Sequence, residues 1–128
     1  MKHLIVCPEY PPAEYAGGIG TYVHQISRML VEAGDTVHVV AVRWKGARVK
    51  KECPHDRLTI HRVGEIHAWW HTPAEPGIRS RELRGLRESS FPPQAFSFQA
   101  ALLAEKLIEQ EEIDIIEGQE FEAPLYYL

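Results

Sequence analysis

The sequence has no long hydrophobic run, and basic residues are not in excess. No apolar stretch approaches the roughly 20 residues that would span a bilayer. Only four apolar residues follow Lys2-His3 before Pro8, too few for a signal peptide. Fourteen Lys and Arg against 18 Asp and Glu give a net charge of −4. We therefore expect no transmembrane segment, and charge gives no argument for nucleic acid as a partner.

Cysteine is also scarce. Cys7 and Cys53 lie far apart, in no CxxC or Cys/His spacing typical of metal sites. This predicts two reduced, unpaired thiols, no bound metal and a cytoplasmic protein. No Ser/His/Asp arrangement is visible either. The 128 residues, 45% apolar and 25% charged, are enough for one domain with one core.

Apolar runs alternate with helical patterns along the chain. In the first helical pattern, apolar residues recur three and four positions apart, which forms one stripe on a helix. The predicted strands are 3–7, 36–42, 57–63 (near an edge, half exposed) and 113–117; the predicted helices are 19–33 and 94–111, with another starting near Ala123. Segment 43–57 has no sustained period, and 64–93 is a long irregular excursion. This order predicts an α/β fold, a Rossmann-like doubly wound parallel sheet with helices on both faces.

Three glycines, Gly17, Gly18 and Gly20, stand where the first loop meets the first helix. Without side chains, they let an anionic group approach the backbone N–H groups at the positive end of a helix dipole. The spacing is not the dinucleotide motif, because Val23 occupies its last glycine position, and no Walker A lysine follows. A turn that only packs the helix on the strand is the alternative.

In a doubly wound sheet, ligands bind outside the carboxyl ends of the strands, where the strand order reverses. Two loops should flank that point: the glycine loop after the first strand, and residues 117–121 after the last.

Three short segments resemble a known family. They are Pro-Glu-Tyr-Pro-Pro at 8–12, Gly-Gly-Ile-Gly-Thr at 17–21 and Val-His-Val-Val at 37–40. Residues 3–42 closely resemble the start of the retaining GT-B glycosyltransferases of the family 4 type, which include glycogen synthase, sucrose synthase and mannosyltransferases. Residues 96–125 resemble them more loosely, and 43–93 carry no resemblance.

The resemblance implies a nucleotide-sugar donor, a carbohydrate or lipid-linked acceptor, and no cofactor. It implies donor phosphate and sugar contacts from Gly17, Gly18 and Gly20. Many members carry a His-containing segment after the last of these strands, where this chain has an acidic version with Glu120 as a candidate assisting group. Candidate acceptor contacts are Tyr10, Glu14, Tyr15, Gln119, Trp69, Trp70 and His71.

Several of these residues have simpler interpretations. Glu120 also suits a helix start, where the dipole favours an acid. Trp69, Trp70 and His71 could instead form an apolar patch over the sheet. His24 is expected to be a surface or packing residue, and the basic residues of 43–51 a solvated charged segment.

The resemblance also implies a division of labour. Residues 1–128 would form the N-terminal, acceptor-side domain of a hexosyltransferase, with the nucleotide-sugar-binding domain following Leu128. The chain stops in an apolar segment with no capping signal, so we expect it to be truncated and inactive alone. The alternative is a stand-alone flavodoxin-like or response-regulator-like α/β module that binds a small anion.

Overall fold

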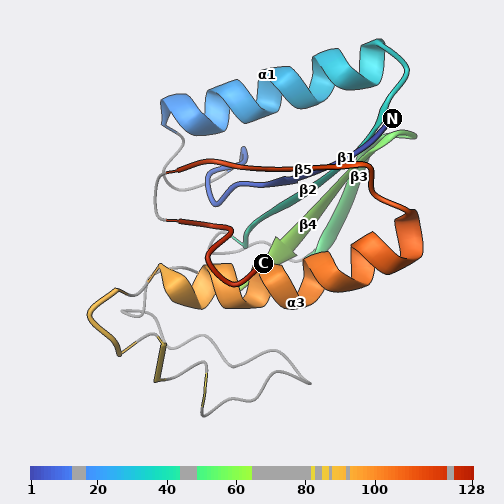
Figure 1. Cartoon of the computed structure of the whole chain (residues 1–128). Coiled ribbons are helices and arrows are strands. Elements are labelled where there is room, and N and C mark those ends of the chain that lie inside the picture. The colour runs from blue at the N-terminus through green and yellow to red at the C-terminus, as the bar shows by residue number, and fades with distance from the viewer. Residues whose placement is uncertain are drawn as a thin grey trace.

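A computed structural model describes residues 1–12, 17–43, 49–64, 82, 85–86, 88–91, 93–120 and 123–128. Across these residues the chain forms one sheet between two helices (Figure 1). The elements are β1 (Lys2–Val6), α1 (Gly18–Glu32), β2 (Thr36–Val42), β3 (Lys51–His55), β4 (Leu58–Val63), α3 (Gln94–Glu111) and β5 (Ile115–Gly118).

The strand order in the sheet is β3-β4-β2-β1-β5. β1 pairs in parallel with both β2 and β5, and β2 pairs in parallel with β4. The chain therefore builds outward from β1 to β4 and then returns through α3 to place β5 on the other side of β1. The order reverses between β1 and β5, which confirms the predicted doubly wound α/β fold.

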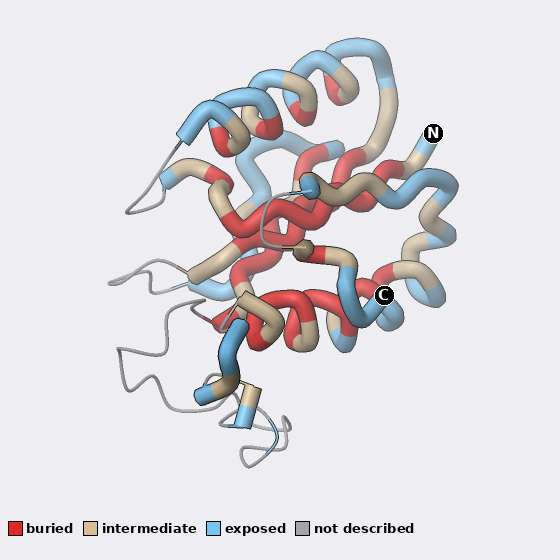
Figure 2. The backbone as a smooth tube through the Cα atoms, turned by 60° about the vertical axis from the view of Figure 1, so that its left-hand side comes forward, coloured by how far each residue is buried: buried red, intermediate tan, exposed pale blue. Residues whose placement is uncertain are grey.

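Each face of the sheet packs against one helix because successive strand residues point to opposite sides. On the α1 face, Ile5, Val37, Val39 and Ile60 pack against Val23 and Val31. On the other face, Leu4, Val6 and Val40 pack against Phe96, Ala100, Ala104 and Leu107 of α3. Figure 2 shows the buried residues concentrated in the central strands and on the inner sides of both helices.

The sequence missed one strand, β3, which lies in a segment predicted to have no regular structure. β3 pairs antiparallel with β4 at the sheet edge, and its burial is low along its length. An exposed edge strand needs no apolar alternation, so its sequence carries no strand pattern. Because β3 occupies the sheet edge, β4 is an inner strand. β4 is therefore mostly buried, whereas the sequence predicted a half-exposed strand near the edge.

The end of the chain also differs from the prediction. Residues 124–127 form turns instead of the helix expected near Ala123, with Tyr126 N–H donating to the Ala123 carbonyl at 3.0 Å. Within the described ranges, no helix is long and apolar enough to cross a membrane.

Candidate functional site at the carboxyl edge of the sheet

The carboxyl ends of β1 and β5 lie side by side, because Val6 is in register with Gly118. The segment after β1 leads to the glycine turn at the start of α1, and the segment after β5 begins with Gln119 and Glu120. Both predicted loops thus leave the sheet at the point where the strand order reverses, as expected from the sequence.

Gly17 is the N-cap residue of α1, and its backbone is extended, with φ −86° and ψ −167°. A glycine has no side chain with which to cap the helix. Glu9 binds the backbone of the N-cap residue instead: its Oε2 accepts a hydrogen bond from Gly17 N–H at 3.0 Å. The Gly17 carbonyl in turn accepts the Thr21 N–H at 3.1 Å. A carboxylate therefore already lies at the positive end of the α1 dipole.

The three glycines of this turn have different surroundings. A Cβ on Gly20 would overlap the carbonyl oxygen of Glu9, so only glycine lets the loop pack against the helix there. A Cβ on Gly17 would come within 2.8 Å of Glu9 Oε2. A Cβ on Gly18 would meet no described atom within 4 Å. Packing therefore requires Gly20, whereas the described residues leave the space beside Gly18 open.

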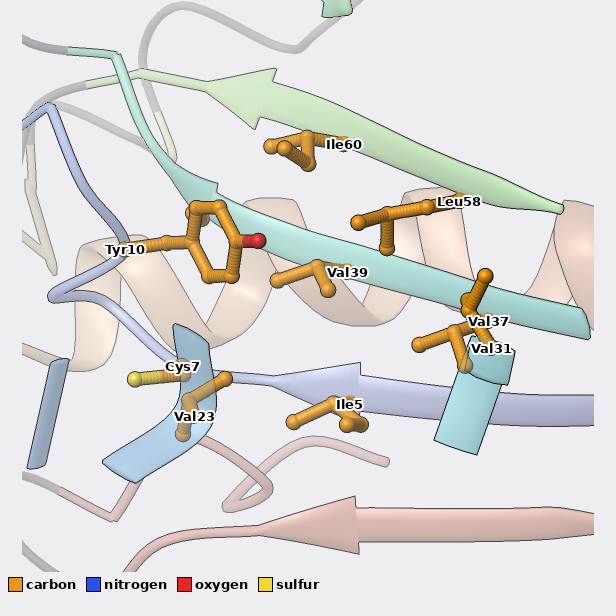
Figure 3. Close-up of a cluster of buried hydrophobic side chains, with 10 residues drawn as sticks. Ile5, Cys7, Tyr10, Val23, Val31, Val37, Val39, Leu58 and Ile60 are labelled. Atoms are coloured by element: carbon orange, nitrogen blue, oxygen red, sulfur yellow. The ribbon is translucent and has the colours of Figure 1, made fainter. Parts of the chain in front are cut away.

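Tyr10 points into the core (Figure 3) and is only 2% exposed. Its hydroxyl lies 3.2 Å from Ser27 Oγ of α1, and its ring packs edge-on against His24. Burial raises the pKa of the Tyr10 hydroxyl. This geometry favours a packing role for both Tyr10 and His24. Contact between Tyr10 and an acceptor stays a prediction.

Gln119 and Glu120 lie at the carboxyl edge of the sheet, beyond β5. Gln119 Nε2 donates to Glu117 Oε1 at 3.3 Å, and the exposed Glu120 accepts the Ala123 N–H at its backbone carbonyl at 3.2 Å. Leu125 packs on Gly118 so closely that a Cβ there would overlap it. The remaining predicted acceptor contacts, Glu14, Tyr15, Trp69, Trp70 and His71, lie outside the described residues.

Cys7 follows β1 directly and is fully buried. Burial raises the pKa of its thiol to about 11, with smaller contributions from the negative charges of Glu9 and Glu117. The thiol is therefore protonated at neutral pH and is not a nucleophile. Cys53, in contrast, is exposed, and both cysteines are free.

A groove of about 450 Å³ lies between one side of α1, the β3–β4 hairpin and residues 10–12 of the loop after β1. Of the predicted site residues that the structure describes, Tyr10 alone lines it. The glycine turn and Gln119–Glu120 do not line it, but the groove shares the 8–12 loop with the candidate site.

Two residues that the sequence did not single out shape the candidate site. Glu9 caps the glycine turn, and Arg62, buried in β4, binds backbone carbonyls of the loop that contains Glu9. Glu9 belongs to the 8–12 segment that carries the family resemblance, so the sequence offered a reason to single it out. Arg62 gave no signal, because a charged residue in a strand ordinarily predicts exposure. Among the described residues, no three His, Cys, Asp or Glu side chains are grouped so that they could share a metal ion.

Residues 16–128 match the family model of Glycosyltransferase Family 4. The matched segment begins just before the glycine turn and includes β5 with the residues that follow it. No relative was found among curated proteins.

Proposed function

Because this chain belongs to glycosyltransferase family 4, we propose that it forms the acceptor-side domain of a retaining hexosyltransferase. The family implies a nucleotide-sugar donor and an acceptor. In this proposal the nucleotide part of the donor is held mainly by a second domain outside residues 1–128. The family match also weighs against a stand-alone small-anion module.

The geometry of the glycine turn is the observation that carries the proposal. Glu9 Oε2 lies 3.0 Å from Gly17 N, so an anionic oxygen fits against this amide. No described atom lies within 4 Å of where a Cβ on Gly18 would stand, which leaves room beside this amide. The first N–H groups of a helix have no partner within the helix and favour negative charge. These features support contact between the turn and the donor diphosphate through Gly17 and Gly18.

Gly20 contributes differently from the other two glycines. Its missing Cβ admits the Glu9 carbonyl. We infer that Gly20 shapes the turn by packing and brings the N–H groups near the donor without needing to contact it.

The acceptor would approach from the side of β5. Glu120 is exposed, and Gln119 is half-buried beside Glu117. Carboxylate and amide groups pair well with sugar hydroxyls. We propose that Gln119 orients the acceptor and that Glu120 assists at the reacting hydroxyl. Glu14, Tyr15 and the Trp69-Trp70-His71 segment complete the proposed acceptor side.

Catalysis in this arrangement rests on positioning and electrostatics. The acceptor oxygen forms its bond to the anomeric carbon on the face from which the diphosphate leaves, as retention of configuration requires. The bond between the anomeric carbon and the diphosphate breaks, the diphosphate keeps the electron pair, and the proton of the acceptor hydroxyl passes to it. N–H groups directed at the developing negative charge stabilise it because they need no reorganisation during the reaction. Holding both substrates in register lowers the barrier further.

The proposal can be tested in the full-length protein by measuring nucleoside diphosphate release from UDP-glucose, UDP-galactose and GDP-mannose, with and without a panel of sugar acceptors. Release that depends on acceptor identifies transfer. Glu120→Gln and Gln119→Ala should raise the acceptor KM or lower kcat while acceptor-free hydrolysis of the donor stays near normal. Glu109→Gln, an exposed position on α3, is the matched control.

Two results would contradict the proposal. One is equal loss of donor hydrolysis and transfer in Glu120→Gln and Gln119→Ala, which would place these residues on the donor side. The other is micromolar binding of a nucleotide-sugar to residues 1–128 alone, measured by calorimetry. That result would mean that this domain, and not a second one, carries the main donor site.

A further inference from the structure

Arg62 of β4 is a cation in the protein interior. Its side chain is 0% exposed. Burying a charge is destabilising unless ion pairing and hydrogen bonds compensate. An apolar side chain would fill this position without that cost. The contacts of Arg62 therefore indicate its role.

The guanidinium of Arg62 binds three separate segments. Nη1 donates to the Tyr10 carbonyl at 2.7 Å, and Nη2 donates to the Pro11 carbonyl at 2.9 Å. Nη1 also lies 3.3 Å from the carbonyl of Val42 at the end of β2. Nε donates to Glu52 Oε1 of β3 at 2.8 Å, which pairs the charge.

The loop after β1 depends on donors from elsewhere. Pro8, Pro11 and Pro12 have no backbone N–H, so this segment cannot hold itself by a regular hydrogen-bond ladder. Val42 N–H binds the Pro8 carbonyl at 3.2 Å, and Arg62 binds the next carbonyls at Tyr10 and Pro11. The planar fork of an arginine can bind several acceptors in fixed geometry, which an ammonium group cannot do.

The same loop sets the position of the glycine turn. Glu9, the neighbour of Tyr10, binds Gly17 N–H with its carboxylate. The carbonyl of Glu9 also fits where Gly20 lacks a side chain. A shift of the Tyr10–Pro11 backbone would therefore move Glu9 and disturb both contacts at the start of α1.

We propose that Arg62 is a positioning residue for sugar transfer: it fixes the 8–12 loop through the Tyr10 and Pro11 carbonyls, and the loop fixes the glycine turn. This inference rests on the proposed role of that turn in donor binding. Its structural part, control of the turn by Arg62, is measured separately from activity.

The experiment compares Arg62→Lys, Glu52→Gln and Asp35→Asn in the full-length protein. Arg62→Lys keeps the charge but cannot span both carbonyls. Glu52→Gln removes the ion pair and keeps the carbonyl contacts. Asp35→Asn is the control at the opposite edge of the sheet, where Asp35 binds the N-terminal amine at 2.6 Å and His3 at 3.0 Å.

Amide hydrogen exchange and nucleoside diphosphate release are both measured. In Arg62→Lys, the hydrogen-bonded amides of the glycine turn, Gly17 and Thr21, should exchange about tenfold faster or more, whereas amides of α3 change no more than in Asp35→Asn. The kcat for nucleoside diphosphate release should fall about a hundredfold, because a displacement of about 1 Å costs that much in a positioned reaction. Glu52→Gln should change kcat much less than Arg62→Lys.

Uniform acceleration of exchange across α1 and α3 would overturn the proposal, since it would make Arg62 a general stabilising residue. Faster exchange at Gly17 and Thr21 with unchanged kcat would refute the role in transfer and leave the proposed function of the domain intact. If Arg62→Lys does not fold, the Arg62→Gln/Glu52→Gln double variant takes its place. Removing both partners leaves no uncompensated buried charge, and the same two outcomes apply.

Discussion

The carboxylate of Glu9 lies 3.0 Å from the backbone nitrogen of Gly17 and closes the N-terminus of α1. The helix has no other side-chain cap at its N-cap residue. The negative charge of Glu9 thus occupies the position where the proposed function places an anionic donor group. Glu9 and the donor would compete for the same positive end of the helix.

Glu9→Gln should therefore lower the KM for the nucleotide-sugar in the full-length protein. The amide oxygen of glutamine can still accept the Gly17 N–H, but the repulsion between two anions is gone. The loss of favourable charge at the helix dipole should cost no more than about 1 kcal/mol of stability. Steady-state kinetics and thermal unfolding measure the two effects.

A higher donor KM in Glu9→Gln would contradict this account and would make the Glu9 charge part of the binding site. Glu32→Gln is the matched control. It removes one negative charge from an exposed position at the other end of α1, far from the glycine turn. It should leave the donor KM unchanged.

The two cysteines should react with a maleimide at very different rates. Cys53 is exposed and should be labelled in the folded protein, without prior reduction. Cys7 is buried and its thiol pKa is raised to about 11, so it should be labelled only after denaturation. Mass spectrometry of native and denatured samples gives the count and site of the labels. Rapid native labelling of Cys7 would mean that the end of β1 opens readily.

The buried strands could be predicted from the sequence because they are continuous apolar runs. β2 is an example: Thr36–Val42 was predicted with the observed bounds, since strands buried on both faces carry few polar residues. The sequence also predicted that the loops after β1 and β5 lie next to each other, because the strand order of a doubly wound sheet reverses there. β3 could not be predicted, because Lys51–His55 is an exposed edge strand without an apolar face.

The candidate site was harder to predict than the fold because its residues act through contacts that sequence does not encode. Tyr10 was predicted as a candidate acceptor contact, and the sequence did not indicate that its ring fills the core under α1. The separate roles of Gly18 and Gly20 depend on which of them faces the Glu9 carbonyl. The buried Arg62 is identifiable only from the carbonyls that converge on it.

The His38–His61 pair should make the protein sensitive to acid. The two rings are buried between the sheet and α3 and stack, with Nδ1 of His38 3.2 Å from Nε2 of His61. Burial lowers the pKa of His61 to about 4, and the neighbouring His38 and Lys51 add to the effect. Burial also lowers the pKa of His38, although Glu111 opposes this and Lys51 and Lys2 reinforce it.

Both histidines thus bind a proton less readily in the folded protein than in the unfolded chain. Stability is then full above the unfolded pKa of about 6.5 and falls as the pH drops toward 4, by up to about 1.4 kcal/mol per pH unit for each proton. Urea unfolding at pH 7.5, 6 and 5 measures this slope. His61→Phe should reduce the slope, whereas His55→Gln, at an exposed position, should leave it unchanged. Equal slopes in both variants would exclude the buried pair as the cause.

Gly18→Ala and Gly20→Ala should separate packing from ligand contact within one turn. Gly20→Ala places a methyl group on the Glu9 carbonyl, so the backbone must shift, and the variant should lose about 1–3 kcal/mol of stability. Gly18→Ala meets no described atom within 4 Å, and an alanine in a helix restricts the unfolded chain, so its stability should be equal or higher by up to about 1 kcal/mol.

Activity should nevertheless fall in Gly18→Ala, because the methyl group intrudes where the donor would approach the backbone. We expect kcat of the full-length protein to drop about a hundredfold while thermal unfolding stays near that of the wild type, since donors directed at the leaving group contribute this much to the rate. In Gly20→Ala the loss of activity should follow the loss of stability. Normal turnover in folded Gly18→Ala would mean that the space beside Gly18 is not used by the substrate, and the glycine turn would then serve only to join β1 to α1.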